Sequence, residues 1–383
     1  MEWHAESRFG QLASPIPWRS WRLGGWFLVI EPPRRQGRQG DVLATTITEK
    51  LKSSKRRSLA IVARIMSVFS SMIVSHPAEL ARIKRKFVLA FGVFDGVHRG
   101  HQAILQQLRL LAAKHDALPA VFFFHPSPKA VLFPDQAPKM LYPLFEKQAL
   151  FEEAGILHRV CLPFTRELAQ LEPQEFLDQY LFSTGLALAG FCVGEDWRFG
   201  ARNSGDAQLL KNIAGERGLE VRIVPALEVN GAPVSSTRIR RAIQRGDFAE
   251  AALLLGRPWR ICGKVTRGRG LAGTGLECPT ANLEDPELLL PPWGIYAARA
   301  SLQGQGKPLE GIIYIGDAPT VRKDDSPQVI VELHLFDFSG NLYDQEIRIE
   351  PVQFLRESRK FPNEEALKTQ IHQDINQARE ILT

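Results

Sequence analysis

The sequence contains no long hydrophobic run. Among its 383 residues, no stretch approaches the roughly 20 uninterrupted apolar residues that a membrane-spanning helix needs. The apolar share of 44% is ordinary for a globular chain. A chain of this length commonly forms two folded units, because single cores stop growing efficiently at smaller sizes. We therefore predict a globular protein with two folded domains and no membrane partner.

Cysteine is scarce as well. The four cysteines are scattered singly, without a Cys-x-x-Cys pair, at Cys161, Cys192, Cys262 and Cys278. Disulfide frameworks and structural zinc sites both need clustered cysteines, so this pattern argues against both. It is typical of a reducing compartment, and we predict a cytoplasmic protein.

The folded part has no excess of either charge. Of the 48 Lys and Arg and the 42 Asp and Glu residues, 12 and 5 lie in residues 1–71, which leaves 36 and 37 for residues 72–383. Binding to nucleic acid needs a positive surface that neutralises phosphates. The near-neutral body therefore argues against a nucleic-acid partner.

Residues 1–71 show neither helical nor strand periodicity. They hold four of the seven tryptophans, and the apolar run WFLVI is too short for a signal peptide. A short amphipathic helix near residues 58–74, with basic residues before it, would suit an organelle or membrane address. A disordered tail, or an over-long start ahead of Met66 or Met72, is the simpler interpretation. We predict a basic, disordered extension over residues 1–71.

Strands and helices alternate from residue 86 to about residue 255. Apolar runs predict strands, and amphipathic stretches between them predict helices, which together indicate a parallel sheet covered on both faces. The expected strands cover residues 86–94, 119–124, 158–164, 190–194 and 219–225. The expected helices follow residue 98 and cover residues 144–155, 172–181 and 206–218.

The alternation stops near Gly256-Arg257-Pro258. Strand patterns follow over residues 261–268, 294–302, 311–316, 328–336 and 345–352. Only the last stretch is helical: Asn363 can cap it, and an apolar stripe runs to Leu382. We predict an antiparallel sheet or barrel closed by one terminal helix.

The first strand delivers the sequence GVFDGVHRGH, residues 92–101, to the carboxyl edge of the parallel sheet. A helix begins there, and free backbone N–H groups at such a position attract anions. The glycines Gly92, Gly96 and Gly100 let a phosphate approach, and His98 and His101 can donate to its oxygen atoms without a metal. A turn with incidental histidines is the simpler alternative for residues taken singly.

GVFDGVHRGH resembles the HxGH signature of nucleotidyltransferases, in the form carried by bifunctional riboflavin kinase/FAD synthetases. Residues 122–128, 163–177, 194–206 and 234–259 resemble further segments of that family, in the same order. The resemblance implies a Rossmann-like FMN adenylyltransferase domain at residues 72–257. In the barrel, PTANL at residues 279–283 resembles the riboflavin kinase signature, which implies a riboflavin kinase domain at residues 258–383.

The resemblance also implies site residues for adenylyl transfer. His98 and His101 would serve the ATP phosphates as catalytic residues. Ser235, Ser236 and Thr237 would present hydroxyl groups at a second helix start, although such residues are also ordinary helix caps. The full set expected to bind nucleotide in this half is Gly92, Phe94, Asp95, Gly96, Gly100, Asp196, Ser235, Ser236, Thr237 and Arg238.

For the kinase, the resemblance implies Glu332 as the catalytic base, although strand periodicity alone would make it a solvent-facing carboxylate. Thr280 and Asn282 would contact Mg²⁺ and ATP, Gly263 and Gly268 would line the nucleotide site, and Arg356 would lie at the flavin. The implied substrates are ATP, riboflavin and FMN, with Mg²⁺ as cofactor. Weak self-association is left open.

The barrel departs from the family pattern at four positions. Glu277 and Cys278 replace Gly-Phe before PTAN, Tyr314 replaces an asparagine, and Ser358 replaces a glutamate. Each departure could weaken phosphorylation. Two alternatives therefore stay beside the bifunctional enzyme: an FMN adenylyltransferase with a weakened or inactive kinase domain, and a non-catalytic flavin-sensing protein.

Overall fold

The computed structural model describes residues 71–266, 281–284, 288–302, 306–317 and 329–383. The predicted extension lies outside these residues except for Ser71, and so do Gly268, Glu277, Cys278 and Thr280. In the chain so described, no helix combines the length and the apolar character of a membrane span.

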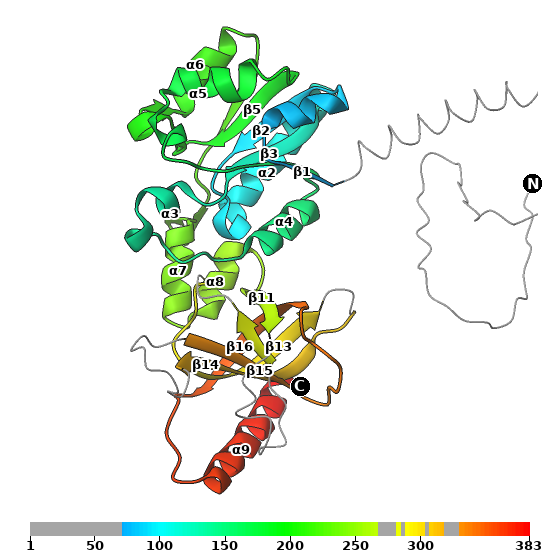
Figure 1. Ribbon diagram of the computed structural model, residues 1–383, viewed down its shortest axis with the longest axis vertical. Helices are drawn as coiled ribbons and strands as arrows, with labels where there is room; N and C mark the ends of the chain where they lie inside the picture. The colour runs from blue at the N-terminus through cyan, green and yellow to red at the C-terminus, as the bar shows by residue number, and fades with distance from the viewer. Residues whose placement is uncertain (1–70, 267–280, 285–287, 303–305, 318–328) are drawn as a thin grey trace, which may run out of the picture. The chain divides into compact units, whose positions relative to one another are not determined.

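A six-stranded sheet forms the centre of the first domain, with the strand order β1-β4-β3-β2-β5-β8 (Figure 1). Every pair of neighbouring strands is parallel, as predicted. The strands are β1 (Met72–Val74), β2 (Phe87–Phe91), β3 (Leu118–Phe124), β4 (His158–Leu162), β5 (Leu188–Gly194) and β8 (Glu220–Val224). Strand β1 was not predicted from the sequence.

Helices cover both faces of this sheet because alternate side chains of each strand point to opposite sides. Val88 and Ala90 of β2 pack in one core with α2 (Arg99–Lys114) and α4 (Leu144–Glu153). Phe87 and Leu89 pack in the other with α5 (Pro173–Leu177) and α6 (Ala207–Gly215). Figure 1 shows this layered arrangement.

The remaining elements of the first domain are short. Helices α7 (Ser236–Gln244) and α8 (Phe248–Leu255) follow the sheet, and α3 (Pro128–Leu132) follows β3. A π-helical turn, Asp178–Phe182, continues α5. Two small hairpins consist of β6 (Arg198–Phe199) with β7 (Gly205–Asp206) and β9 (Glu228–Val229) with β10 (Ala232–Pro233). The 3-10 turns are Pro77–Ile83, Asp95–Val97, Pro134–Gln136, Leu168–Gln170 and Ala201–Asn203.

The second domain is a closed antiparallel barrel with the order β11-β12-β15-β14-β13-β16. Its strands are β11 (Ile261–Thr266), β12 (Ala281–Glu284), β13 (Gly294–Leu302), β14 (Leu309–Asp317), β15 (Val329–Leu335) and β16 (Glu346–Arg356). The prediction of an antiparallel sheet or barrel is confirmed, and β12 is a strand that the sequence patterns did not indicate.

Helix α9 (Glu364–Leu382) ends the chain, as predicted. Asn363 caps it, because its Oδ1 accepts a hydrogen bond of 2.8 Å from the Ala366 N–H. Ala378 and Leu382 on this helix pack against Ile295 and Ile312 of the barrel. The helix therefore covers the outer face of β13 and β14.

Candidate active sites

The loop between β2 and α2 leaves regular structure abruptly. Phe94, Gly96 and Val97 all have positive φ angles, of 50°, 80° and 40°. Such backbone is strained for residues other than glycine. A Cβ on Gly96 would also lie 2.6 Å from a methyl carbon of Leu141, so that position needs glycine. The loop consequently turns the chain so that His98 becomes the N-cap of α2.

His98 and His101 lie against each other at the start of α2. Their rings stack with centroids 3.7 Å apart, and the Nδ1 of His98 accepts a hydrogen bond of 3.4 Å from the His101 N–H. Burial, with the nearby charge of Arg257 in second place, lowers the pKa of His98 to about 4. Burial also lowers the pKa of His101 well below its usual value, with smaller contributions that include Arg257. Both rings are thus neutral at pH 7, and His98 carries its proton on Nε2.

The hydroxyl cluster at the start of α7 reaches the same loop. Ser236 Oγ donates a hydrogen bond of 2.9 Å to the carbonyl oxygen of Asp95. Ser235 caps the helix by accepting from the Arg238 N–H at 3.3 Å, which is the ordinary capping role. Thr237 lies exposed in the first turn. The imidazole pair and the serine cluster are therefore neighbours.

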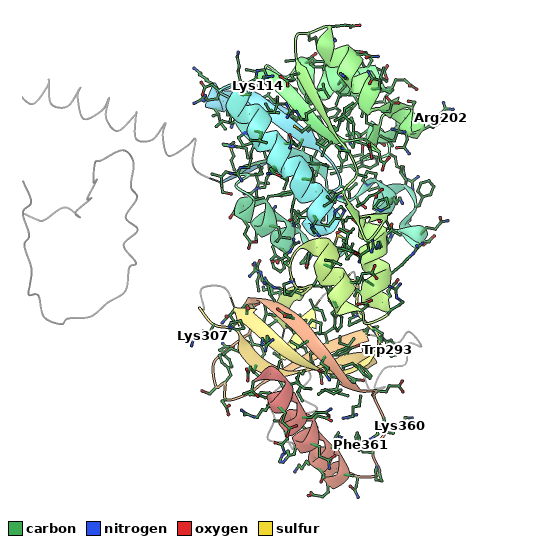
Figure 2. All side chains as sticks on the ribbon, turned by 180° about the vertical axis from the view of Figure 1, so that it is seen from behind. Lys114, Arg202, Trp293, Lys307, Lys360 and Phe361 are labelled. Atoms are coloured by element: carbon green, nitrogen blue, oxygen red, sulfur yellow. The ribbon has the colours of Figure 1, made fainter. Side chains whose placement is uncertain are left out.

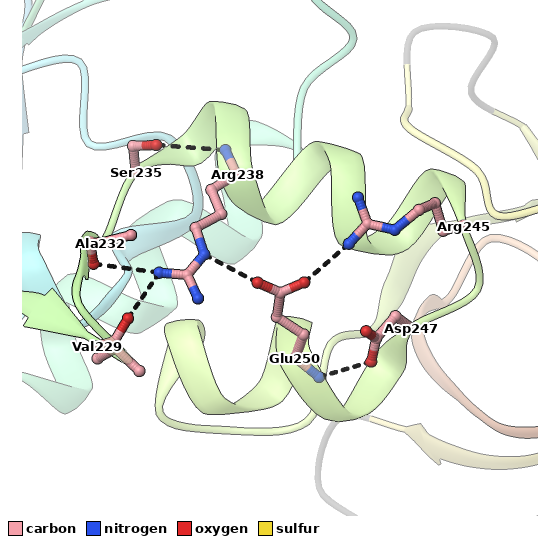
Figure 3. Close-up of polar contacts among 7 residues, drawn as sticks. All are labelled: Val229, Ala232, Ser235, Arg238, Arg245, Asp247 and Glu250. Carbon is pink, nitrogen blue, oxygen red and sulfur yellow. Dashed lines mark hydrogen bonds and ion pairs between the residues drawn. The ribbon is translucent and has the colours of Figure 1, made fainter.

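Arg238 points away from the loop. Its guanidinium contacts the Glu250 carboxylate at 2.8 Å and donates to the carbonyl oxygens of Val229 and Ala232 at 2.8 and 3.1 Å (Figure 3). Every one of these partners belongs to α8 or to the β9–β10 hairpin. In this structure Arg238 joins these elements and makes no contact with His98 or His101.

Arg240, on the same helix, does reach the histidine loop, and sequence reasoning missed it. It forms an ion pair with Asp95 Oδ2, and its Nε donates to the carbonyl oxygen of Lys139 at 2.8 Å. Residues four apart share a helix face, so the contact of Ser236 with Asp95 also places Arg240 there. The spacing of four residues is visible in the sequence, but it identifies Arg240 only once the contact of Ser236 with Asp95 is known.

The carboxylate of Asp95 is held on both oxygen atoms. Oδ1 accepts from the Leu141 N–H at 3.2 Å, and Oδ2 is taken by Arg240. Burial raises the pKa of Asp95, although the charges of Arg240 and Lys147 act in the opposite direction. Asp95 therefore fixes the loop to α7 and to the segment before α4.

Three other predicted nucleotide residues have different surroundings. A Cβ on Gly92 would come within 3.1 Å of the Phe94 ring, and a Cβ on Gly100 would come within 3.2 Å of the His98 ring. Both glycines therefore allow close packing. Asp196 is exposed in the turn after β5. Within the described residues its side chain has no hydrogen bond or ion pair.

Three of the predicted kinase residues, Asn282, Glu332 and Arg356, share one row across the barrel. Glu332 on β15 lies opposite Asn282 on β12 and opposite Tyr314 on β14. The row continues through Ile295 on β13 to Arg356 on β16. Residues directly opposite on neighbouring strands project from the same face, so these side chains share one side of the barrel wall.

This row lies on the outer face of the wall, since Val331 and Leu333, on either side of Glu332, are buried in the core. Glu332 itself is half-buried, and that burial raises the pKa of its carboxyl group. A carboxylate with a raised pKa is suited to accepting a proton. Gly263 lies in β11, three residues before Thr266, whose ladder partner is Asn282.

Arg356 is fixed by the terminal helix. Its Nε and Nη2 donate to the buried carboxylate of Asp374 on α9 at 2.7–3.1 Å. The ring of Phe361, labelled in Figure 2, lies 5.6 Å from the guanidinium carbon. The guanidinium is thereby held in one orientation at the β16 end of the row.

Comparison with known proteins gives matches along both domains. A model of the FAD synthetase family matches residues 80–238, and a model of the riboflavin kinase family matches residues 255–382. A solved structure described as a macrolide-efflux protein from Streptococcus pneumoniae has a TM-score of 0.67 and 28% identity, and the match covers 80% of this chain and 98% of that one.

Curated relatives match over nearly their whole length. The bifunctional riboflavin kinase/FMN adenylyltransferase of Pseudomonas fluorescens is 39% identical over 77% of this chain and 93% of its own. Proteins of the same name from Escherichia coli strain K12 and Bacillus subtilis strain 168 are 36% and 33% identical, over 92% and 96% of their lengths. The chain belongs to the bifunctional riboflavin kinase/FMN adenylyltransferase family.

Proposed function

We propose that this chain makes both flavin cofactors: the barrel phosphorylates riboflavin to FMN with ATP, and the parallel-sheet domain transfers an adenylyl group from ATP to FMN. The observation that carries the proposal is the hydrogen bond of Ser236 to the Asp95 carbonyl, because it joins the serine cluster to the paired imidazoles. We place the boundary of the two catalytic domains after residue 257, with residues 1–71 outside both.

Adenylyl transfer needs alignment and charge stabilisation, with no protein nucleophile. An FMN phosphate oxygen attacks the α-phosphorus of ATP, the bond from that phosphorus to the bridging oxygen breaks, and pyrophosphate leaves. Neutral His98 donates through Nε2–H, because its Nδ1 already accepts the His101 N–H. His101 lies beside it for the same phosphates. Such donors stabilise charge that develops in the transition state.

The nucleotide cradle combines backbone and side chains. We assign the loop at Gly92, Phe94, Gly96 and Gly100 to the phosphates, with Ser235, Ser236 and Thr237 at the second helix start. Asp95 orients this loop, and Asp196 stays a candidate contact for nucleotide or flavin. We assign the phosphate-facing guanidinium to Arg240 in place of Arg238, since Arg240 is the one that reaches Asp95.

Phosphorylation needs a base at a flavin hydroxyl. Glu332 accepts the proton of the ribityl hydroxyl while that oxygen forms its bond to the γ-phosphorus of ATP and the bond from that phosphorus to the bridging oxygen breaks. Arg356 lies at the flavin, and Gly263 and Gly268 line the nucleotide. The raised pKa of Glu332, caused by burial, suits this role.

The kinase residues also fit a magnesium nucleotide. Asn282 offers an amide oxygen directly opposite the Glu332 carboxylate, and oxygen atoms are the ligands that Mg²⁺ prefers. We assign Asn282 and Thr280 to Mg²⁺. When bound with ATP, the ion neutralises phosphate charge.

The cellular setting follows from composition. The thiols of Cys161, Cys192 and Cys262 are free, as in proteins of a reducing compartment, and we propose the cytoplasm. The near-equal charges of residues 72–383 support small molecules, without nucleic acid, as the partners. Self-association, if present, is weak.

One assay tests both halves of the proposal. Purified full-length protein is incubated with riboflavin, ATP and Mg²⁺, and flavins are separated by chromatography. We expect FMN to appear first and FAD to follow. Conversion of added FMN to FAD with riboflavin left untouched would remove the kinase half, and no turnover of either flavin would remove the whole proposal.

A further inference from the structure

Every carbonyl oxygen of the loop at residues 93–97 accepts a hydrogen bond. Lys147 Nζ donates to Val93 O at 3.2 Å, and Ser236 donates to Asp95 O at 2.9 Å. Arg257 donates to Gly96 O, and to Val97 O at 3.1 Å. The Val97 N–H donates to the remaining carbonyl, that of Phe94, at 3.3 Å. The negative ends of these peptide groups are thus all engaged by donors.

Two of the donors are unusual because they are cations without an anionic partner. Lys147 is 5% exposed, and its ammonium lies 5.2 Å from the centre of the Phe123 ring. Arg257 is bound only to backbone carbonyls and lies over the Tyr142 ring. Across the described residues, neither cation forms an ion pair, whereas Arg240 is neutralised by Asp95. Buried unpaired charge is costly, so an apolar side chain would suit a purely structural role better.

We propose that Arg257 and Lys147 are positioning residues for adenylyl transfer: they hold the carbonyl oxygens of the histidine loop away from the triphosphate and place positive charge behind it. This inference rests on the proposed function of the first domain. Neither side chain needs to touch the nucleotide. Each acts through the loop that presents the backbone N–H groups and the imidazoles.

Burial is the main cause that keeps the imidazoles neutral, and the same two cations act in the same direction. After burial, Arg257 is the next cause that lowers the pKa of His98, and Lys147 contributes at His101 after burial and the His98 ring. A proton on His98 Nδ1 would remove the acceptor of the His101 N–H. Charged or titratable groups surround the two rings from five parts of the chain. They are Asp95 of the 3-10 turn Asp95–Val97, His98 and His101 at the start of α2, Lys147 of α4, Arg240 of α7, and Arg257 after α8.

Variants at Arg257 separate charge from geometry. R257Q removes the charge, whereas R257K keeps the charge but cannot span two carbonyl groups as a planar guanidinium does. We expect R257Q to lower FAD formation from FMN by about 10- to 100-fold, because small misplacements of a phosphate site have effects of that size. Riboflavin phosphorylation by the same sample should stay within about twofold, which reports that the protein is folded.

The histidine titration gives a readout that a merely structural role would not move. Imidazole C–H signals followed by NMR between pH 7 and pH 4 should show His98 titrating at higher pH in R257Q, by roughly 0.5 pH unit, and near the wild-type position in R257K. This measurement needs no turnover. It therefore still tests the arrangement if the protein makes no FAD, in which case the proposed function fails separately.

A matched control comes from the other end of α2. Like Arg257, Arg109 donates to backbone oxygen, in its case the carbonyl of Ala154 at 3.4 Å. It lies far along the helix from the loop. R109Q should leave both reactions and the His98 titration unchanged. K147M, which keeps the packing on Phe123 without the charge, should lower FAD formation by about tenfold.

Three outcomes would overturn the proposal. The first is FAD formation within twofold of wild type in both R257Q and K147M. The second is an equal loss of both activities in R257Q protein that unfolds at the wild-type temperature, which would show that the side chain has no specific role in adenylyl transfer. The third is an unchanged His98 titration in R257Q, which would show that the guanidinium does not act on the ring.

Discussion

In the sheet domain the candidate site lies where regular structure stops, whereas in the barrel the candidate base lies within paired strands. The loop at residues 93–97 exchanges strand geometry for left-handed turns, and its carbonyl oxygens are held by hydrogen-bond donors. The barrel residues Asn282, Glu332 and Tyr314 keep their backbone in strand pairing. One site therefore binds largely with backbone groups that side chains hold in place. The other depends on the side chains themselves.

This contrast predicts that single substitutions are more damaging in the barrel. We expect Glu332→Gln to lower riboflavin phosphorylation by about 10³-fold, because a general base typically contributes 10²- to 10⁴-fold. The rate is measured by FMN formation from riboflavin and ATP. Conversion of added FMN to FAD serves as the control and should persist. An active E332Q kinase would mean that the proton goes elsewhere.

In the sheet domain, His101→Ala should lower FAD formation by about 10²- to 10³-fold, the usual effect of removing one transition-state donor. Backbone donors and His98 remain, which limits the loss. FMN formation in the same variant should be unchanged. Equal loss of both products would contradict the division of labour between the domains.

Two of the three arginines of α7, Arg238 and Arg240, sharpen the comparison within one helix. We expect Arg240→Gln to lower FAD formation by about 10²-fold, since it releases Asp95 and the loop. Arg238→Gln removes contacts to Glu250 and to two carbonyls that lie away from the histidines. It should lower thermal stability and leave the rate of FAD formation at low temperature nearly intact. A larger loss of FAD formation in Arg238→Gln than in Arg240→Gln would indicate that Arg238 is the arginine that acts at the site.

Asp374→Asn tests how the barrel orients Arg356. The change leaves a mostly buried guanidinium unpaired, so we expect the barrel to lose about 2–3 kcal/mol of stability, and the KM for riboflavin to rise. Denaturant unfolding and initial rates measure the two effects. The exposed ion pair between Asp337, in the turn after β15, and Arg379 of α9 is the matched control, and Asp337→Asn should cost at most about 0.5 kcal/mol. Equal losses would contradict the assigned role of Asp374.

The smallest expected difference is in pH dependence. Burial raises the pKa of Glu332, so the base gains its proton above the usual carboxyl range as pH falls. The pKa of His98 is lowered to about 4, so the adenylyl site keeps its neutral ring to lower pH. Riboflavin phosphorylation should therefore fail at higher pH than FAD formation from FMN. Initial rates of each reaction from pH 8 to pH 4 check this order, and the opposite order would exclude one of the two assignments.

The sequence predicted elements better than side-chain directions. Alternating apolar runs identified the parallel sheet, and Asn363 marked the start of α9 because capping chemistry is local. Arg238 and Arg240 could not be distinguished from the sequence, since residues two apart on a helix face different sides and the phase of α7 was unknown. Lys147 stood at an apolar position of its helix, four residues before Phe151, which was a signal for a buried cation. Thr280 of the kinase motif lies outside the described residues, whereas Asn282 of the same motif is described.

The position of the last barrel strand determines how much of the barrel is lost when the chain is cut. Strand β16 pairs with β11 on one side and β13 on the other, so a single segment closes the cylinder. A premature stop or a protease cut ahead of Glu346 would disrupt the pairing of β16 with both β11 and β13. The kinase half should then disappear as a unit, while the parallel sheet, which uses no residue beyond Val224, would survive as a fragment.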